Sequence, residues 1–246
     1  MEEKLQQCPV LKDRKVGIIN FGVQGYGTAQ ELMTFRHHVW DYAPDLVILA
    51  FYAANDIRNN YRPLERNYLR PYFVYKNGEL ESDMSFRTMK SWPRGRYVFS
   101  MVDILLIWLI ENYLILQLII KIDMDSKKSL FLNDYGKIII SFYGEPQLNY
   151  DWDKGWQVIK GLIKLMRDEV YEKGADFMII AISESHQVHP DLEHSQKFQN
   201  NHNLSDLYYR DRRIEEFGKQ ENIPVYILAR PYRRKSRKNR EVFIWV

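Results

Sequence analysis

The sequence predicts an α/β protein with a parallel sheet that helices cover on both faces. The first observation is a strand–helix–strand succession between Val16 and Ala53, which is the unit that builds parallel sheets. The second is that helix and strand alternate again between Trp152 and Ala229, where each of two predicted helices is followed by a short apolar run. One sheet can take up all of these strands, so we expect a single α/β domain over residues 1–229.

The first strand is expected over Val16–Val23, a short apolar run with β-branched residues that is bounded by charge and glycine. A helix should follow from Thr28 to about Tyr42. Thr28 and Glu31 have the spacing of a capping box, and Pro44 stops the helix. This unit predicts two neighbouring parallel strands joined by one helix.

The second strand is expected over Asp45–Ala53, the third over Asp176–Ile182 and the fourth over Pro224–Ala229. A polar helix near Ser205–Asn222 separates the last two. The helix before the third strand should end at Gly174, and its apolar side is formed by Trp152, Trp156, Ile159, Ile163, Met166 and Val170.

A long insertion, about residues 57–149, separates the two halves of the domain. It contains a predicted hairpin with Asn77-Gly78 as its turn. It also contains the apolar stretch Ile104–Ile120, which Glu111 and Gln117 interrupt. Polar residues fall on one narrow side of that stretch, so we expect a buried helix of a soluble protein, with a membrane-contacting helix as the alternative.

Composition and charge exclude several classes of protein. Cys8 is the only cysteine, so no disulfide framework within the chain is expected. The opening residues are polar, so neither a signal peptide nor a transmembrane helix is expected; the localisation is open, and the sequence as written fits a cytoplasmic protein. The net charge is +3, but residues 230–241 hold seven positive and one negative side chains, so the remainder sums to 3 − 6 = −3. We therefore expect residues 230–246 to be a solvated basic tail and expect neither nucleic-acid binding nor stable membrane insertion.

Three glycines, Gly22, Gly25 and Gly27, lie between the first predicted strand and its helix. They fit a tight turn that needs positive φ, and they also fit a loop that lets a ligand approach the backbone. Their order is G-x-x-G-x-G, whereas the dinucleotide fingerprint is G-x-G-x-x-G. The dinucleotide interpretation is therefore weak, and no cofactor is expected.

The second predicted strand is followed by Asn55-Asp56, at the same edge of the sheet as the glycines. An asparagine amide and a glycine N–H can both donate hydrogen bonds to a developing oxyanion. The two stretches together thus point to part of an oxyanion hole, while each stretch alone also fits an ordinary turn.

The stretches "NFGVQGYGTAQ" and "PDLVILAFYAANDIRNN" together resemble the SGNH (GDSL-type) hydrolases, a family of esterases, lipases and carbohydrate acyl-modifying enzymes. By this resemblance Gly25 matches the oxyanion glycine block and Asn55 the oxyanion asparagine block, with Ala53 where that block usually has glycine. The resemblance implies a flavodoxin-like three-layer α/β/α sheet and hydrolysis of an ester bond, with Gly25 and Asn55 stabilising the tetrahedral oxyanion.

The other two blocks of the family have no match in this chain. No Gly-Asp-Ser precedes the glycine stretch, and no Asp-x-x-His follows the last predicted strand. We therefore expect a fragment that lacks the first strand of the family's sheet, together with the nucleophilic serine and the histidine base. An impaired esterase is the first expectation for its function, and a non-catalytic module that binds acyl groups or carbohydrates is the alternative.

The loop after the third predicted strand offers weak substitutes for the missing groups. Ser183 and Ser185 lie near His186, but no nucleophile elbow surrounds them. His186, His189 and His194 match no known zinc spacing, so we expect no metal. The ester and the oligomeric state are open, although aromatic residues of the insertion such as Tyr61, Tyr72 and Trp92 are expected to shape the choice of substrate.

Overall fold

The computed structural model describes residues 2–89 and 150–229, except residues 10, 12, 54 and 66. The predicted apolar helix over Ile104–Ile120, the aromatic residue Trp92 and the basic tail lie outside these residues. Within the described part, no helix combines the length and the apolar character that crossing a membrane requires.

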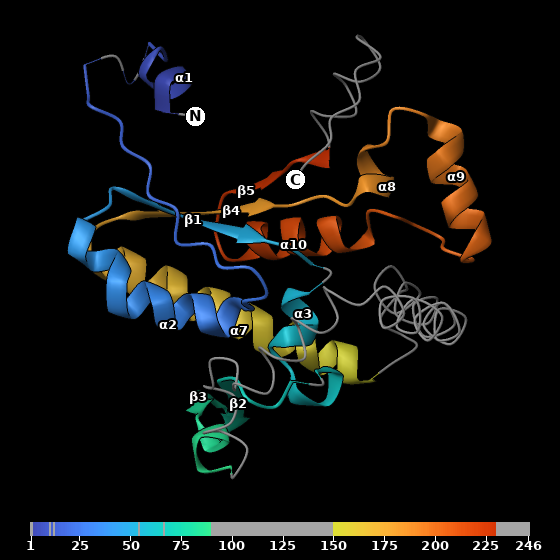
Figure 1. The fold of residues 1–246 in the computed structure, drawn as a ribbon, viewed down its shortest axis with the longest axis horizontal. Helices are drawn as coiled ribbons and strands as arrows, with labels where there is room; N and C mark the ends of the chain where they lie inside the picture. Colours follow the sequence, from blue (N-terminus) through green and yellow to red (C-terminus); the bar gives the residue numbers. More distant parts are fainter. Residues whose placement is uncertain are drawn as a thin grey trace, which may run out of the picture.

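A parallel sheet of three strands forms the centre of the protein (Figure 1). The strands are β1 (Leu46–Phe51), β4 (Asp176–Ala181) and β5 (Val225–Ile227), and their order in the sheet is β1-β4-β5. Leu46 lies opposite Asp176 and Phe51 opposite Ala181, so β1 and β4 pair over their whole length. These strands confirm three of the four strands that the sequence predicts.

The predicted strand over Val16–Val23 is wrong, because these residues form neither helix nor strand. Their backbone N–H groups bond to side chains and not to a neighbouring strand. The N–H of Val16 donates to the Gln6 side chain at 3.0 Å, and the N–H of Ile18 donates to the Glu2 side chain at 2.5 Å. Ile19 is 52% exposed, not buried as the apolar run predicts. An apolar run forms a strand only where a neighbouring strand supplies hydrogen-bond partners for its backbone N–H and C=O groups.

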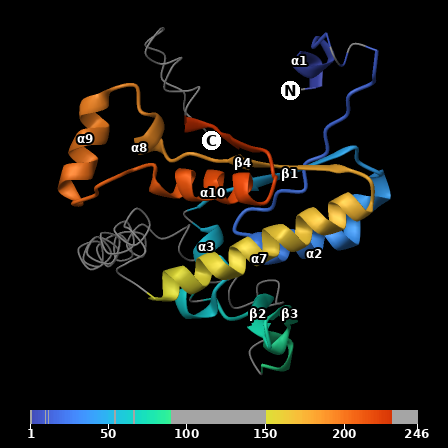
Figure 2. The same ribbon diagram turned by 180° about the vertical axis from the view of Figure 1, so that it is seen from behind.

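Three helices cover the same face of the sheet (Figures 1 and 2). They are α2 (Thr28–His38), α7 (Tyr150–Glu172) and α10 (Tyr209–Gln220), and a 3₁₀ turn over Val39–Tyr42 follows α2. All three were expected from helical spacing. Their apolar sides and the inner side chains of the strands form one core, which includes Leu32, Phe35, Leu49, Phe51, Trp156, Ile159, Ile163, Phe177, Ile179, Ile214 and Phe217.

The opposite face of the sheet is open within the described residues. Leu46, Ile48 and Tyr226 point to it and are 45%, 48% and 48% exposed. The short helix α1 (Glu2–Gln6) buries none of its residues. An α/β fold with a parallel sheet is therefore present as predicted, whereas the described helices form one covering layer and not the expected two.

The start of the insertion packs beneath the helical layer. Helix α3 (Asp56–Asn59) follows β1 directly, and β2 (Tyr72–Lys76) pairs with β3 (Glu79–Asp83) as an antiparallel hairpin. Asn77 and Gly78 have φ angles of 51° and 90°, which confirms the predicted turn. The remaining short elements are 3₁₀ turns at Arg62–Leu64 and Ser85–Thr88 and helices α8 (Ser185–Val188) and α9 (Leu192–Asn201).

Gly218 makes the closest helix-to-sheet contact of α10 and provides a test of this packing. A Cβ at this position would lie 2.3 Å from Val225 Cγ2 and 2.8 Å from the Ile223 carbonyl oxygen. We expect Gly218→Ala to lower the free energy of unfolding by roughly 1–3 kcal/mol, because α10 must move away from β5. Gly17→Ala is the control, since a Cβ there meets nothing within 4 Å. Equal stability of the two variants in urea unfolding would contradict this packing.

Candidate functional site

The glycine-rich loop before α2 is held by local backbone geometry. The N–H of Gly22 donates to Asn20 Oδ1 at 2.8 Å, and the N–H of Tyr26 donates to the Val23 carbonyl at 3.1 Å. Gly25 has φ +80°, a conformation that strains any other residue, although a Cβ there would meet no atom within 4 Å. Gly25 is therefore required by the turn and not by close packing.

Gly27 and Asn60 join the start of α2 to α3. A Cβ on Gly27 would lie 2.9 Å from Asn59 Cβ, so only glycine allows the two helices to approach this closely. Asn60 is fully buried, and its Oδ1 accepts the N–H of Ala29 at 2.7 Å while its Nδ2 donates to the carbonyl of Asp56. One asparagine thus satisfies an N–H of the first turn of α2 and fixes α3 against it.

Asn55 is the residue that precedes α3, four positions after the end of β1. Its N–H donates to the Tyr52 carbonyl at 3.1 Å. Its side-chain oxygen Oδ1 is buried and has no hydrogen-bond partner among the described residues. A buried amide oxygen without a partner costs free energy and can be satisfied only by a hydrogen-bond donor, so Asn55 Oδ1 is an unsatisfied acceptor just after β1.

The two predicted oxyanion residues are close in topology but are not bonded to each other. No hydrogen bond of the described residues joins Gly25 to Asn55. Their loops are joined by neighbouring residues: Gly27 packs against Asn60, and Asn60 accepts the N–H of Ala29. The Gly25 carbonyl instead accepts a hydrogen bond from Arg70 Nη2 at 3.3 Å. The packing of Gly27 against Asn59 and the bond from Ala29 to Asn60 therefore bring the glycine loop next to the segment that follows β1, although no strand leads into the glycine loop.

A pair of buried carboxyl groups lies behind the carboxyl edge of the sheet. Asp56 is 2% exposed, and its Oδ2 accepts the N–H of Tyr52 at 2.6 Å. Burial, and then the charge of Glu31, raise the pKa of Asp56 well above its usual value, while the Tyr52 N–H opposes this. Burial also raises the pKa of Glu31 to about 7, with the Thr28 hydroxyl opposing it in part. Burial and the proximity of the two carboxyl groups thus both disfavour the state in which the two are ionised together.

The loop after β4 meets the loop after β1 at the same edge. Tyr52 Oη donates to the carboxylate of Glu184, which ties the two strand ends together. Ser183 Oγ lies next to this contact in the chain, is buried and has no hydrogen-bond partner among the described residues. No histidine is therefore bonded to Ser183 in the described part, so this serine has no base to activate it.

The histidines after β4 contact one another, and no hydrogen bond of the described residues joins them to Ser183 or Ser185. His186 Nδ1 lies 3.2 Å from His194 Nε2, and the His189 ring stacks on His194 at 3.9 Å between centroids. Burial, and then the neighbouring imidazoles, lower the pKa of His186. No group of three or more His, Cys, Asp or Glu side chains in the described part of the chain is arranged to hold a metal ion. The region is helical (α8 and α9), whereas the sequence suggests a solvated loop.

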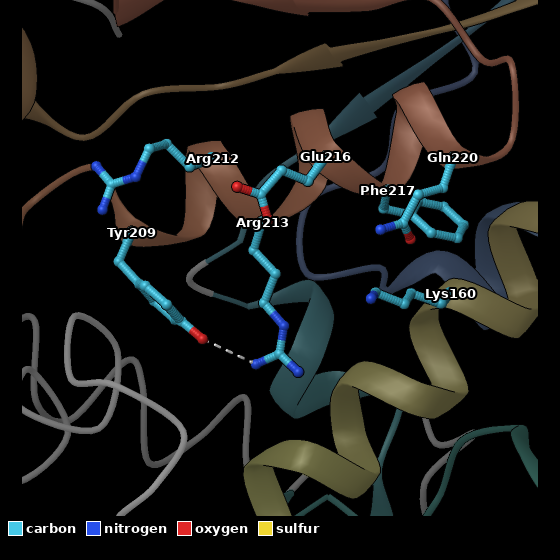
Figure 3. Close-up of a pocket in the computed structure, with 7 residues that line it drawn as sticks. All are labelled: Lys160, Tyr209, Arg212, Arg213, Glu216, Phe217 and Gln220. Carbon is cyan, nitrogen blue, oxygen red and sulfur yellow. Dashed lines mark hydrogen bonds between the residues drawn. The ribbon is translucent and has the colours of Figure 1, made fainter.

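A separate hollow of about 370 Å³ lies between α7 and α10 (Figure 3). Arg213 donates to Tyr209 Oη at 3.2 Å and pairs with Asp153 at 3.1 Å, and Arg212 pairs with Asp206. Lys160 lies over the Phe217 ring at 5.4 Å. The arginines are thus already paired, and neither Gly25 nor Asn55 lines this hollow.

Two features of the edge are not identified by the sequence analysis. Asn60 follows Asp56 by four positions, the spacing of one helical turn, and this spacing was the available signal for a side chain that bonds back to α3. The predicted capping box joins Thr28 and Glu31, but α2 begins after Gly27, whose N–H donates to Gln30 Oε1 at 3.3 Å, so Gln30 and not Glu31 takes the third position of the helix. The shift of one residue turns Glu31 by about 100° into the interior.

Comparisons of the chain with protein-family models, with curated proteins and with solved structures found no significant match. The likeness to SGNH hydrolases therefore depends on the two motifs around Gly25 and Asn55.

The carboxyl pair predicts a pH-dependent stability. Between pH 4.5 and about 7 the folded chain keeps the Glu31 proton that the unfolded chain has released. The stabilisation is fully present below pH 4.5 and is lost as the pH rises to 7. We expect the free energy of unfolding of the wild type to fall by an amount on the order of 2 kcal/mol between pH 5 and pH 8. This fall should be absent in Glu31→Gln, which cannot ionise.

Urea unfolding at these two pH values measures the effect. Glu172→Gln is the matched control, because Glu172 is an exposed glutamate at the end of α7. A pH dependence in Glu31→Gln equal to that of the wild type and of the control would show that Glu31 is not the buried proton site.

Proposed function

We propose that this chain is an SGNH-type hydrolase that acts on ester bonds of a lipid or carbohydrate, and that Gly25 and Asn55 belong to its oxyanion hole. The observation behind the proposal is the position of Asn55, which lies just beyond the carboxyl end of β1 in the segment that Asn60 bonds to the start of α2, directly after the glycine loop. Open parallel sheets bind their ligands at this edge.

The chemistry assigned to the two residues is electrostatic. In ester hydrolysis the carbonyl oxygen becomes an oxyanion when the nucleophile adds to the acyl carbon. The Nδ2 of Asn55 and the N–H of Gly25 would donate hydrogen bonds to that oxygen, and each such donor typically contributes about 10²–10³ in rate. Gly25 suits this role because its positive φ makes a tight turn in the loop, and the absence of a side chain lets a ligand approach the backbone.

We further propose that this chain turns over esters poorly. It holds no Gly-Asp-Ser motif and no Asp-x-x-His motif. Ser183, the buried serine at the same edge, has no hydrogen-bond partner among the described residues, and the nearby His186 is engaged with His194. A serine hydroxyl without a base is a weak nucleophile at neutral pH. The chain would therefore bind an acyl group better than it cleaves one.

Binding of a tetrahedral anion tests the oxyanion assignment without requiring turnover. The probe is p-nitrophenyl methylphosphonate, whose charged oxygens resemble the tetrahedral intermediate, and the measurement is titration calorimetry. We expect Asn55→Ala to weaken binding about tenfold, which corresponds to roughly 1.4 kcal/mol. Asn200→Ala is the matched control, because Asn200 is an exposed asparagine on α9. Binding that is unchanged in Asn55→Ala, or absent in the wild type, would refute the proposed site.

Hydrolysis of p-nitrophenyl acetate tests the second part of the proposal. We expect a rate close to the uncatalysed background in the wild type and no further loss in Ser183→Ala. Rapid turnover that Asn55→Ala abolishes would support the family assignment and contradict the proposed lack of a nucleophile. Binding of the phosphonate with no turnover is the behaviour of the acyl-binding module.

A further inference from the structure

Strand β1 has a second edge that no described strand occupies. The N–H of Asp176 donates to the Asp45 carbonyl at 2.9 Å, and the N–H of Ile182 donates to the Phe51 carbonyl at 2.8 Å. Backbone groups alternate in direction along a strand, so the odd-numbered residues of β1 bond to β4. The N–H and C=O groups of Leu46, Ile48 and Ala50 therefore point away from β4.

Among the residues that the structure describes, this edge shows none of the features by which proteins protect exposed strands. None of the three residues has a hydrogen-bond partner for these groups within the described part of the chain. The strand, LVILAF, contains no charged residue, no proline and no glycine. Leu46 and Ile48 are 45% and 48% exposed. A flat, uncharged and apolar edge of this kind is a template for pairing with another strand.

We propose that β1 pairs with β1 of a second copy of this chain, antiparallel, about a two-fold axis that passes beside Ile48. In this register the two Ile48 residues face each other, and Leu46 lies opposite Ala50 of the second copy. All of these residues present their N–H and C=O groups to the free edge, so each opposed pair exchanges two hydrogen bonds. The two sheets become one of six strands.

The side chains of β1 fit this register. The larger Leu46 meets the smaller Ala50, and the two β-branched Ile48 side chains meet on the open face of the sheet, where such pairs stabilise strands. No like charges are opposed, because residues 46–52 contain none. A two-fold arrangement is the usual symmetry of a self-complementary interface.

The size of the contact sets the expected affinity. A contact between two six-residue strands lies at the small end of specific interfaces, so the dimer should be weak and should form only at high protein concentration. The inference is independent of the ester-hydrolase proposal, because it uses the side edge of β1 and not the carboxyl edge that holds Asn55.

A cysteine pair tests the axis directly. In an antiparallel hydrogen-bonded pair the Cα atoms are about 5.5 Å apart, which suits a disulfide. Cys8 is replaced by serine, and Ile48→Cys is compared with Tyr226→Cys, an equally exposed position on β5. After mild oxidation of the full chain we expect a disulfide-linked dimer for Ile48→Cys and monomer for Tyr226→Cys. Equal cross-linking of both, or of neither, would overturn the proposed register.

A proline variant tests the hydrogen bonds. Ile48→Pro removes an N–H from the free edge and leaves the ladder to β4 intact. By light scattering at 100 µM we expect dimer in the wild type and monomer in Ile48→Pro. Should proline prevent folding, judged by circular dichroism, Ile48→Lys decides, because an edge lysine blocks strand pairing. A wild type that stays monomeric, or a dimer that persists in Ile48→Lys, would overturn the proposal.

Discussion

The parallel pairing of β1 with β4 is the constraint on which the rest of the structure depends. It requires the chain to cross over between the two strands, and α7 makes that crossing on the face that α2 and α10 also cover. It also brings the loops after both strands to one edge, where Tyr52 bonds to Glu184. The positions of Asn55, Asp56 and Ser183 follow from this single pairing. The remaining edge of β1 is the part of the sheet that the pairing leaves open.

Buried polar groups give the carboxyl edge its chemical character. Asn60 bonds α2 to α3, and Asp56 accepts the N–H of Tyr52, so these groups order the backbone around Asn55. The oxygen of Asn55 and the hydroxyl of Ser183 differ from them, because they are buried without a partner among the described residues. Unsatisfied groups cost stability, and proteins keep them mainly at functional sites. The proposed ester site thus includes two of the buried polar atoms that have no partner among the described residues.

The sequence predicted correctly those helices and strands that follow from a local pattern of apolar and polar residues. Strands β1 and β4 are short apolar runs between charged or small residues, and α7 has an unbroken apolar side that ends at Gly174, with φ +79°. The run Val16–Val23 has the same pattern but no partner strand, and pairing is a property of the tertiary structure that periodicity does not contain. For the proposed site, the two sequence motifs point to Asn55 and Gly25. They did not reveal that Asn60 joins their loops or that the charge of Glu31 acts on Asp56, since both depend on how α2 and α3 pack.

Hydrogen exchange of the β1 amides, resolved residue by residue by NMR at low protein concentration, tests the central claim most directly. An edge strand bonded only to β4 predicts slow exchange for Val47, Leu49 and Phe51 and fast exchange for Leu46, Ile48 and Ala50. Slow exchange of all six amides in a dilute monomer would contradict the account, because another segment would then have to occupy the free edge of the sheet.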